Sequence, residues 1–200
     1  MLMEDLKTTS HALKEWAVAI KALETGKTIM LLRKGGIHER GGSFHVAQKE
    51  VLLYPTYEHQ QAFMLKSEYA DIISPVTPGW RPETVRISSW ASITDILPIN
   101  NESIVNSLLP FHIWNKYFIC DRLKWKPSQP LYVLLLRTYK LPQSQEIIYR
   151  RQYAGCKSWI DLAEHVDISR STPVLGDYVY SQLVEKIRSL IGDKLYAPSV

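Results

Sequence analysis

The chain is poor in cysteine and has no long apolar run. Its 200 residues include only two cysteines, Cys120 and Cys156, which are far apart and not in a Cys-x-x-Cys spacing. This argues against a disulfide framework and a cysteine-type zinc site, and it fits a reducing compartment. No stretch approaches the roughly 20 apolar residues that span a bilayer, and the first residues lack the basic and apolar regions of a signal peptide. We therefore expect a soluble, cytoplasmic protein that does not associate with membranes.

The common nucleotide-binding motifs are also missing. The glycine pairs at 35–36 and 41–42 do not form the Gly-x-Gly-x-x-Gly fingerprint of dinucleotide-binding proteins. Residues 26–28, Gly-Lys-Thr, lack the upstream glycine of a P-loop and precede a predicted strand instead of a helix. No two histidines lie four residues apart around a glutamate, as they do in helical zinc motifs. We therefore expect no metal site and no cofactor, and P-loop nucleotide hydrolysis is disfavoured.

The composition is that of an ordinary globular protein. Apolar residues make up 46% of the sequence and charged residues 22%, close to the averages for globular domains. A chain of this length can bury a substantial core. We predict one domain over residues 1–200, with a loose lead-in at 1–8 and a C-terminal helix at 177–192.

Basic residues are concentrated in one part of the chain. The net charge is +4, yet residues 116–157 alone contain nine Lys or Arg and only two acidic residues. Such a segment could face the phosphates of a ligand. Equally, it could be a solvated face whose charge is balanced by acidic residues elsewhere in the fold.

Apolar patterns and turn residues predict a mixture of strands and helices. Strands are expected at 28–32, 43–46, 50–54, 84–87 and 131–141, with Pro55 and residues 88–90 ending two of them. Helices are expected at 56–65, 101–108, 111–118, 156–162 and 177–192. The strand at 28–32 does not alternate between apolar and polar residues, so we predict that both of its faces are buried. The Leu run within 131–141 predicts a central position in the sheet.

The segment before the first predicted strand permits two interpretations. Ser10 could cap a helix through Leu23 that Gly26 ends. Alternatively, residues 16–23 could form a strand, with 24–27 as a hairpin turn. The sequence does not separate these two interpretations.

The last helix has the clearest amphipathic pattern. Asp177 would be its N-cap, and Gly192 would end it. The apolar stripe would consist of Val179, Leu183, Ile187 and Leu190. Because strands and helices do not alternate regularly along the chain, we predict an α+β fold with a mostly antiparallel sheet, which could close into a small barrel.

The strongest candidate site follows the strand at 28–32. This strand leads into Arg33 and Lys34, and the glycine-bracketed loop after it carries Arg40. These side chains are suited to binding an anion that the flexible backbone allows to approach closely. Tyr54 and His59 could project into a pocket beside Arg33, because sites are common where strands end. A hairpin with solvated charges is the other interpretation.

Three residues are weaker candidates for catalysis. Glu39, Glu58 and His59 could form an acid/base set for metal-assisted hydrolysis of a phosphodiester. A structural interpretation places Glu58 and His59 on the first turn of a short helix. Glu58 would then gain from the helix dipole, and His59 would make structural hydrogen bonds.

Two of the six tryptophans are candidates for stacking on a base. Trp80 lies in a proline-rich stretch, and Trp125 lies between Lys124 and Lys126 in the basic segment. Single-stranded nucleic acid is bound by such combinations of aromatic and basic side chains. Surface tryptophans also serve in protein contacts.

Several motifs resemble an uncharacterised bacterial family, common in cyanobacteria, known as domain of unknown function 1802. They are ALKEWAVAI at 12–20, LLRKGGI at 31–37, LYPTYEHQ at 53–60, the strand at 131–141 and GCKSW at 155–159. The resemblance covers nearly the whole chain. It implies no established activity and only a loose association with nucleic acids, including occasional linkage to restriction-endonuclease-like regions.

Residues 23–33, LETGKTIMLLR, are similar to a pattern of the ASC-1 homology domains in the PUA-like superfamily. This similarity implies a small β-barrel that binds RNA or modified nucleotides, with Lys27 and Arg33 lining the cleft. The chain departs from the pattern because it lacks a residue between Gly26 and Lys27 and an acidic residue shortly before Arg33.

Together these features favour a cytoplasmic module that binds RNA, DNA or a nucleotide-like anion. The ligand would meet Lys27, Arg33, Lys34 and Arg40, with Tyr54, His59, Trp80 and Trp125 nearby. The alternatives are a metal-assisted phosphodiesterase and a protein-interaction domain without catalysis. The sequence leaves the oligomeric state open.

Overall fold

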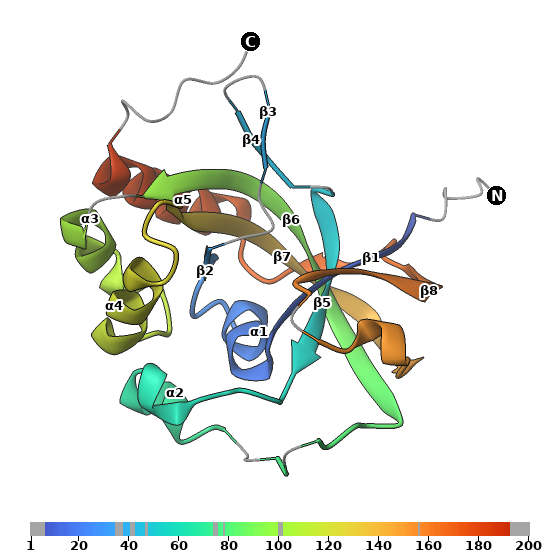
Figure 1. The fold of residues 1–200 in the computed structure, drawn as a ribbon. Helices are drawn as coiled ribbons and strands as arrows, with labels where there is room; N and C mark the ends of the chain where they lie inside the picture. Colours follow the sequence, from blue (N-terminus) through green and yellow to red (C-terminus); the bar gives the residue numbers. More distant parts are fainter. Residues whose placement is uncertain are drawn as a thin grey trace.

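Strands and helices are mixed along the chain of the computed structural model (Figure 1), which describes residues 7–34, 38–40, 43–46, 48–73, 76–77, 79–99, 102–155 and 157–192. The strands are β1 (Thr8–Trp16), β2 (Met30–Arg33), β3 (His38–Arg40), β4 (Ser43–His45), β5 (Glu50–Thr56), β6 (Thr84–Ile99), β7 (Leu131–Ile148), β8 (Trp159–Asp167) and β9 (Thr172–Pro173). The helices are α1 (Ala17–Glu24), α2 (Ser67–Ala70), α3 (Glu102–Ser107), α4 (Lys116–Lys124) and α5 (Asp177–Ile191), with short 3₁₀ turns η1 (Ala62–Met64), η2 (Leu109–Phe111) and η3 (Arg151–Tyr153).

Most strands belong to one sheet with the order β2-β7-β6-β5-β1-β8, in which β9 also pairs with β7. Every pairing in it is antiparallel except that of β1 with β5. The strands β3 and β4 form a separate hairpin, so the predicted strand at 43–46 does not pair with the one at 50–54. The prediction of an α+β fold with a mostly antiparallel sheet is confirmed. Within the described residues, no helix has the length and apolarity to cross a membrane.

The strands β6 and β7 are much longer than predicted. They pair from Thr84 opposite Ile148 to Ile99 opposite Leu131, with irregularities between Ile87 and Ser89 and between Ile93 and Asp95. Such bulges bend a strand without ending it. The predicted end at 88–90 is therefore a bulge within one strand. Likewise Pro142 lies in the unpaired stretch 141–144, where its missing N–H costs no ladder hydrogen bond.

Two apolar clusters lie on this sheet. The first joins α1, α3, α4 and α5 to β2 and to the start of β7, and all of residues 131–136 are buried in it. Since successive strand residues point to opposite faces, this part of β7 is buried on both faces. It lies between β2 and β6, which agrees with the central position predicted for it. The second cluster contains side chains from β1, β5, β6, β7 and β8, and also Tyr153 and Ile168.

The segment 8–24 combines both interpretations of the sequence. It is a strand as far as Trp16 and a helix from Ala17 to Glu24. Ser10 lies within β1 and caps no helix, and the lead-in ends before Thr8. Gly26 follows α1 with φ +67°, and an added Cβ there would lie 2.7 Å from Leu175 Cδ2. A close approach and a left-handed backbone therefore both require this glycine.

Pro55 does not end its strand, contrary to prediction. β5 continues to Thr56, whose Oγ1 donates a hydrogen bond to the Glu15 carbonyl at 3.0 Å. Thr56 consequently caps no helix, and only the short turn η1 occurs in the predicted range 56–65.

Two other predicted helices are also corrected. The range expected as helix 156–162 contains the start of β8 at Trp159, and Cys156 lies outside the described residues. The helix expected at 111–118 begins only at Lys116, where Asn115 Oδ1 accepts a hydrogen bond from Phe118 N at 3.1 Å. The helix expected at 101–108 is α3, which spans Glu102–Ser107.

The C-terminal helix is present, but its buried stripe is rotated from the predicted one. The cap is Gly176 and not Asp177, and the buried residues are Tyr180, Val184, Ile187 and Ile191. The rotation follows from polar contacts with the bulge in β6. Tyr180 OH lies 2.7 Å from Thr94 Oγ1, and Arg188 Nε donates to the buried Asp95 Oδ1 at 2.8 Å.

Candidate functional site

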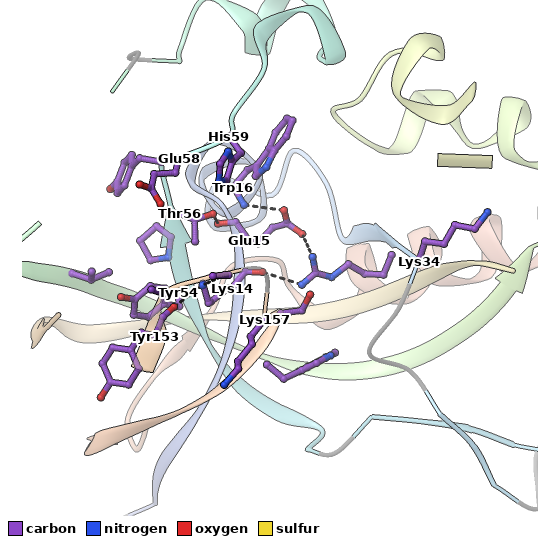
Figure 2. A pocket seen from close by; sticks show the side chains of 18 of the residues that line it. Lys14, Glu15, Trp16, Lys34, Tyr54, Thr56, Glu58, His59, Tyr153 and Lys157 are labelled. Atoms are coloured by element: carbon purple, nitrogen blue, oxygen red, sulfur yellow. Dashed lines mark hydrogen bonds and ion pairs between the residues drawn. The ribbon is translucent and has the colours of Figure 1, made fainter. Parts of the chain in front are cut away.

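A cleft of about 910 Å³ opens where several strands end (Figure 2). Its floor comes from the last residues of β1, β5 and β2 and the first residue of β8. Its walls are residues 57–59, residues 79–82 and the α4 side with residues 125–126. The parallel neighbours β1 and β5 thus deliver their C-terminal ends to one place, a position that commonly holds ligands in sheets.

An ion pair between Glu15 and Arg33 lies at the floor. Arg33 Nη1 is 3.1 Å from Glu15 Oε2, and their side chains are only 15% and 7% exposed. Arg33 Nη2 also donates to the Lys14 carbonyl at 2.9 Å, and Glu15 Oε1 accepts from Trp16 N at 2.8 Å. Arg33 therefore reaches the predicted pocket, but its charge is already compensated by a carboxylate.

Lys34 is buried and holds the end of a helix. Its Nζ donates to the carbonyls of Arg122 at 2.8 Å and Leu123 at 3.1 Å. These are among the last carbonyls of α4, which lack partners within the helix. Burial lowers the pKa of Lys34. In Figure 2 its side chain extends away from Glu58 and His59, toward α4.

Other predicted ligand residues are placed differently. Lys27 is exposed beyond the end of α1 and does not line the cleft. Glu39 and Arg40 lie on β3, and their side chains are outside the described residues. Ligand binding by Lys27 and Arg40 and a catalytic role of Glu39 stay predictions, and Lys27 is not among the residues that line the cleft.

Aromatic side chains dominate the walls. Five of the six tryptophans line the cleft, together with four tyrosines and one phenylalanine: Trp16, Trp80, Trp114, Trp125, Trp159, Tyr54, Tyr57, Tyr149, Tyr153 and Phe118. The predicted stacking residues Trp80 and Trp125 are 39% and 46% exposed. Trp80 meets Tyr57 edge to face, with 5.7 Å between ring centroids. Ring faces are thus available within the cleft.

Basic side chains accompany these rings. Arg122 lies 5.0 Å from the ring centroid of Phe118 and 5.9 Å from that of Trp125, and Lys126 Nζ lies 4.7 Å from the Trp125 centroid. Lys157 also lines the cleft. No carboxylate among the described residues pairs with these three cations.

The acidic residues of the cleft are both compensated. Glu15 and Glu58 are the acidic residues that line it, and Glu58 forms an ion pair with Arg81 on the opposite loop. The helix predicted for Glu58 is replaced by a loop, so its partner is Arg81 and not a helix dipole. The cleft consequently presents a surplus of positive charge to a ligand.

Tyr54 supplies a buried hydroxyl beside the cleft. The residue is 3% exposed, and its OH has no hydrogen-bond partner among the described residues. Burial, followed by the neighbouring Tyr149 and Tyr153, raises the pKa of Tyr54, so the phenol stays protonated. Its ring packs edge to face on Tyr153, with centroids 6.1 Å apart.

Left-handed backbone conformations are concentrated here. Of the three described residues other than glycine with positive φ, His59 at 68° and Lys126 at 48° both line the cleft. Such conformations cost free energy and occur preferentially at functional sites. His59 is exposed, and it lies near Glu58 at one end of the cleft (Figure 2).

Sequence reasoning missed several cleft residues. Lys14 Nζ donates to the carbonyls of Tyr153 at 2.6 Å and Gly155 at 2.8 Å, which ties β1 to the segment before β8. Lys14, Trp16 and Lys157 all belong to the motifs ALKEWAVAI and GCKSW. The motifs were the signal that could have found these residues, since four of them, at 12–20, 31–37, 53–60 and 155–159, contribute residues to one cleft. Among the described residues, no three His, Cys, Asp or Glu side chains are grouped closely enough to hold a metal ion.

These observations define an α+β protein with an open, mostly antiparallel sheet and a basic cleft lined by aromatic side chains. The chain belongs to the family described as "Domain of unknown function (DUF1802)", whose model matches residues 12–186. This confirms the family resemblance seen in the motifs. No curated protein matches the chain.

Three solved structures similar to the chain are those of ASCH from Zymomonas mobilis and of two single-substitution mutants of that protein. The first is 14% identical and has a TM-score of 0.44, with 88% of this chain and 93% of that chain covered. The mutants are 12% and 14% identical with TM-scores of 0.42 and 0.40, and each covers 88% of this chain. The alignments cover 96% and 94% of the mutant chains.

Proposed function

We propose that the cleft binds single-stranded nucleic acid and holds an unpaired nucleotide between its aromatic walls. The observation that carries this proposal is the combination, in one cleft, of five tryptophans with Arg122, Lys126 and Lys157, while both acidic lining residues are ion-paired. Bases stack on aromatic faces irrespective of their identity, and phosphates are bound by Lys and Arg.

The aromatic walls favour unpaired bases over a duplex. In a duplex the faces of the bases are stacked on one another, so only splayed-out bases can stack on protein side chains. The volume of about 910 Å³ is within the range of ligand pockets, about 300–1,000 Å³. A nucleotide with its flanking phosphates is a ligand of this class.

The two ends of the cleft differ in chemistry. Tyr57, Trp80 and the compensated pair of Glu58 with Arg81 form one end. The other end lies toward α4, where Lys34 points (Figure 2). Arg122 and Lys126 contact the Trp125 ring there. We expect a base at the first end and phosphate at the second. Of the basic residues just named, Arg81 is paired with Glu58, whereas Arg122 and Lys126 at the second end have no carboxylate partner among the described residues.

Binding is better supported than phosphodiester hydrolysis. The alternative reaction would use Glu39, Glu58 and His59, but the Glu58 carboxylate is held by Arg81, and the Glu39 side chain lies outside the described residues. A general base must be free to accept a proton from its substrate or from water. No specific geometry in the cleft favours catalysis over binding.

The test is titration of labelled RNA and DNA single strands of about ten nucleotides, and of the matching duplexes, followed by fluorescence anisotropy. We expect single strands to bind more tightly than duplexes. Affinity should fall steeply between about 50 mM and about 200 mM salt, because each phosphate contact releases a counterion.

Charge-removing variants locate the site. Arg122→Ala and Lys126→Ala should each lower the slope of log K against log salt by about 0.7, the value for one phosphate on a single strand. Lys27→Ala removes an exposed charge outside the cleft and should leave the slope unchanged. Absence of nucleic-acid binding at low salt would overturn the proposal. Association with a protein partner that does not depend on salt would favour the alternative of a protein-interaction domain.

A further inference from the structure

A second pair of exposed rings lies outside the cleft. Phe63 of η1 and Tyr117 of α4 are 59% and 61% exposed, although their ring centroids are only 5.4 Å apart at an interplanar angle of 71°. Apart from Tyr57 and Trp80 in the cleft, no other described pair of exposed aromatic side chains makes a ring contact. Neither Phe63 nor Tyr117 lines the cleft.

The pair is held rigidly by the backbone beneath it. Asn115 Nδ2 donates to the carbonyls of Phe63 at 2.7 Å and Leu65 at 2.9 Å, while its Oδ1 caps α4 at Phe118 N. Asn115 N also donates to the Met64 carbonyl at 3.0 Å. One side chain therefore fixes both elements that carry the two rings. A preorganised surface loses little entropy when it binds a ligand.

Residues that line the cleft are close neighbours of Tyr117 along the chain. Phe118, the residue after Tyr117, faces the cleft and lies beneath the Arg122 guanidinium. Trp114, which also lines the cleft, lies three residues before Tyr117, ahead of the start of α4. The same short stretch thus carries rings into the cleft and onto the outer surface, where the exposed Lys116 adds a positive charge.

We propose that Phe63 and Tyr117 form a stacking platform for bases that flank the nucleotide in the cleft, so that the binding site extends along a single strand. This inference rests on the proposed function. Edge-to-face packing at this exposure leaves ring surface open, and each base needs only one such surface. A stable protein interface would bury about 800 Å² on each partner, far more than two rings offer. Nucleic acid is therefore the occupant that the platform fits.

Oligonucleotide length provides the test. A labelled dinucleotide can occupy only the cleft, whereas an oligouridine of about ten nucleotides can also reach the platform. The variant Phe63→Leu/Tyr117→Leu keeps apolar side chains while removing both stacking surfaces. We expect it to weaken binding of the longer strand by about 5- to 150-fold, the range for loss of stacking on one base, and to leave dinucleotide binding unchanged.

The matched control is Ile72→Ala, which removes another exposed apolar side chain, 57% exposed. It should bind both oligonucleotides like the wild type. Phe63→Tyr/Tyr117→Phe keeps both rings and should restore full affinity for the longer strand. Thermal unfolding of each variant provides a check on folding that is independent of binding.

The outcomes separate this inference from the proposed function. If the leucine variant binds the longer strand as well as the wild type does, the platform is refuted while the cleft proposal stands. If the substitutions weaken binding of both oligonucleotides equally, the rings act through the cleft and the platform is also refuted. If the wild type binds neither oligonucleotide, the proposed function itself fails. A pull-down in which the ring pair is needed for a protein partner, with no effect on the longer strand, would assign the surface to that partner instead.

Discussion

Arg33 and Glu15 face each other at the floor of the cleft, with 3.1 Å between Arg33 Nη1 and Glu15 Oε2. They lie on β2 and at the end of β1, strands that are far apart in the order of the sheet. The pair therefore connects the β2 side of the cleft to the β1 side. Breaking a buried ion pair by removing one partner leaves the other charge without compensation.

We expect Glu15→Gln to lower the free energy of unfolding by about 3–5 kcal/mol, as measured by urea denaturation. The control is Glu58→Gln, which breaks a half-exposed ion pair with Arg81 and should cost less than about 1 kcal/mol. Equal losses in the two variants would show that the Glu15 pair gains nothing from its burial.

His112 should make stability depend on pH. It is 2% exposed, and burial, followed by the nearby Lys66, lowers its pKa from 6.5 to about 3. Because the pKa is lower in the folded state, the unfolded state binds more protons below pH 6.5. The stability contributed by neutral His112 is therefore complete above that pH and is lost as the pH falls toward 3.

We expect the wild type to lose up to about 1.4 kcal/mol of stability per pH unit below its unfolded-state pKa from this residue alone. His112→Leu should remove this part of the slope, measured by urea unfolding between pH about 6.5 and about 5. His165→Gln changes an exposed histidine and should leave the slope as it is. A His112→Leu protein with the wild-type slope would contradict the prediction.

We expect Lys34 to contribute more to the stability of the fold than to the binding of an anionic ligand. Its buried Nζ donates to two carbonyls at the end of α4, the helix that carries Arg122. Hydrogen bonds that involve a charged group contribute about 1.5–3 kcal/mol, so Lys34→Met should lower stability by that amount. Lys124→Met, at an exposed position in the same helix turn, should change stability by less than about 0.5 kcal/mol.

Nucleic-acid binding distinguishes an anchoring role of Lys34 from a direct contact of its charge with phosphate. If it only anchors α4, Lys34→Met should weaken binding without changing the salt dependence. If its charge contacts phosphate, the slope of log K against log salt should fall by about 0.7. The second result would favour the sequence-based interpretation of Lys34 as an anion-binding residue.

Features that depend on local pattern were predictable from the sequence. The apolar run at 28–32 corresponds to β2, and the strand predicted at 131–141 is the first part of β7, in which residues 131–138 are buried. The structure also brings Arg33, Tyr54, His59, Trp80 and Trp125 to one cleft. Glycines, strand ends and exposed aromatic residues are local signals of such a site.

Features that depend on distant partners were not predictable. The change from strand to helix after Trp16 is set by pairing of β1 with β5 and β8, which lie about 40 and about 150 residues further along the chain. Lys34 anchors a helix end 88 residues away in sequence. Arg188 of α5 contacts Asp95 of β6, 93 residues away in sequence. No local pattern encodes these contacts.

Trp80 should contribute a stacking surface at one end of the cleft. Its ring meets Tyr57 edge to face at 5.7 Å, and both side chains are 39% exposed. The adjacent ion pair of Glu58 with Arg81 holds the same two loops together. The ring is therefore positioned before a ligand arrives, which limits the entropy lost on binding.

We expect Trp80→Ala to weaken binding of single strands by about 1–3 kcal/mol, the amount measured for loss of stacking on one base. Trp80→Phe keeps an aromatic face and should retain most of the affinity. Trp90→Phe changes a buried tryptophan of the second core and should leave binding unchanged. The measurement is anisotropy titration with one oligonucleotide at fixed salt. Trp80→Ala and Trp80→Phe proteins of equal, wild-type affinity would show that no base stacks at this end, and the base would then have to be placed on Trp125 near Arg122.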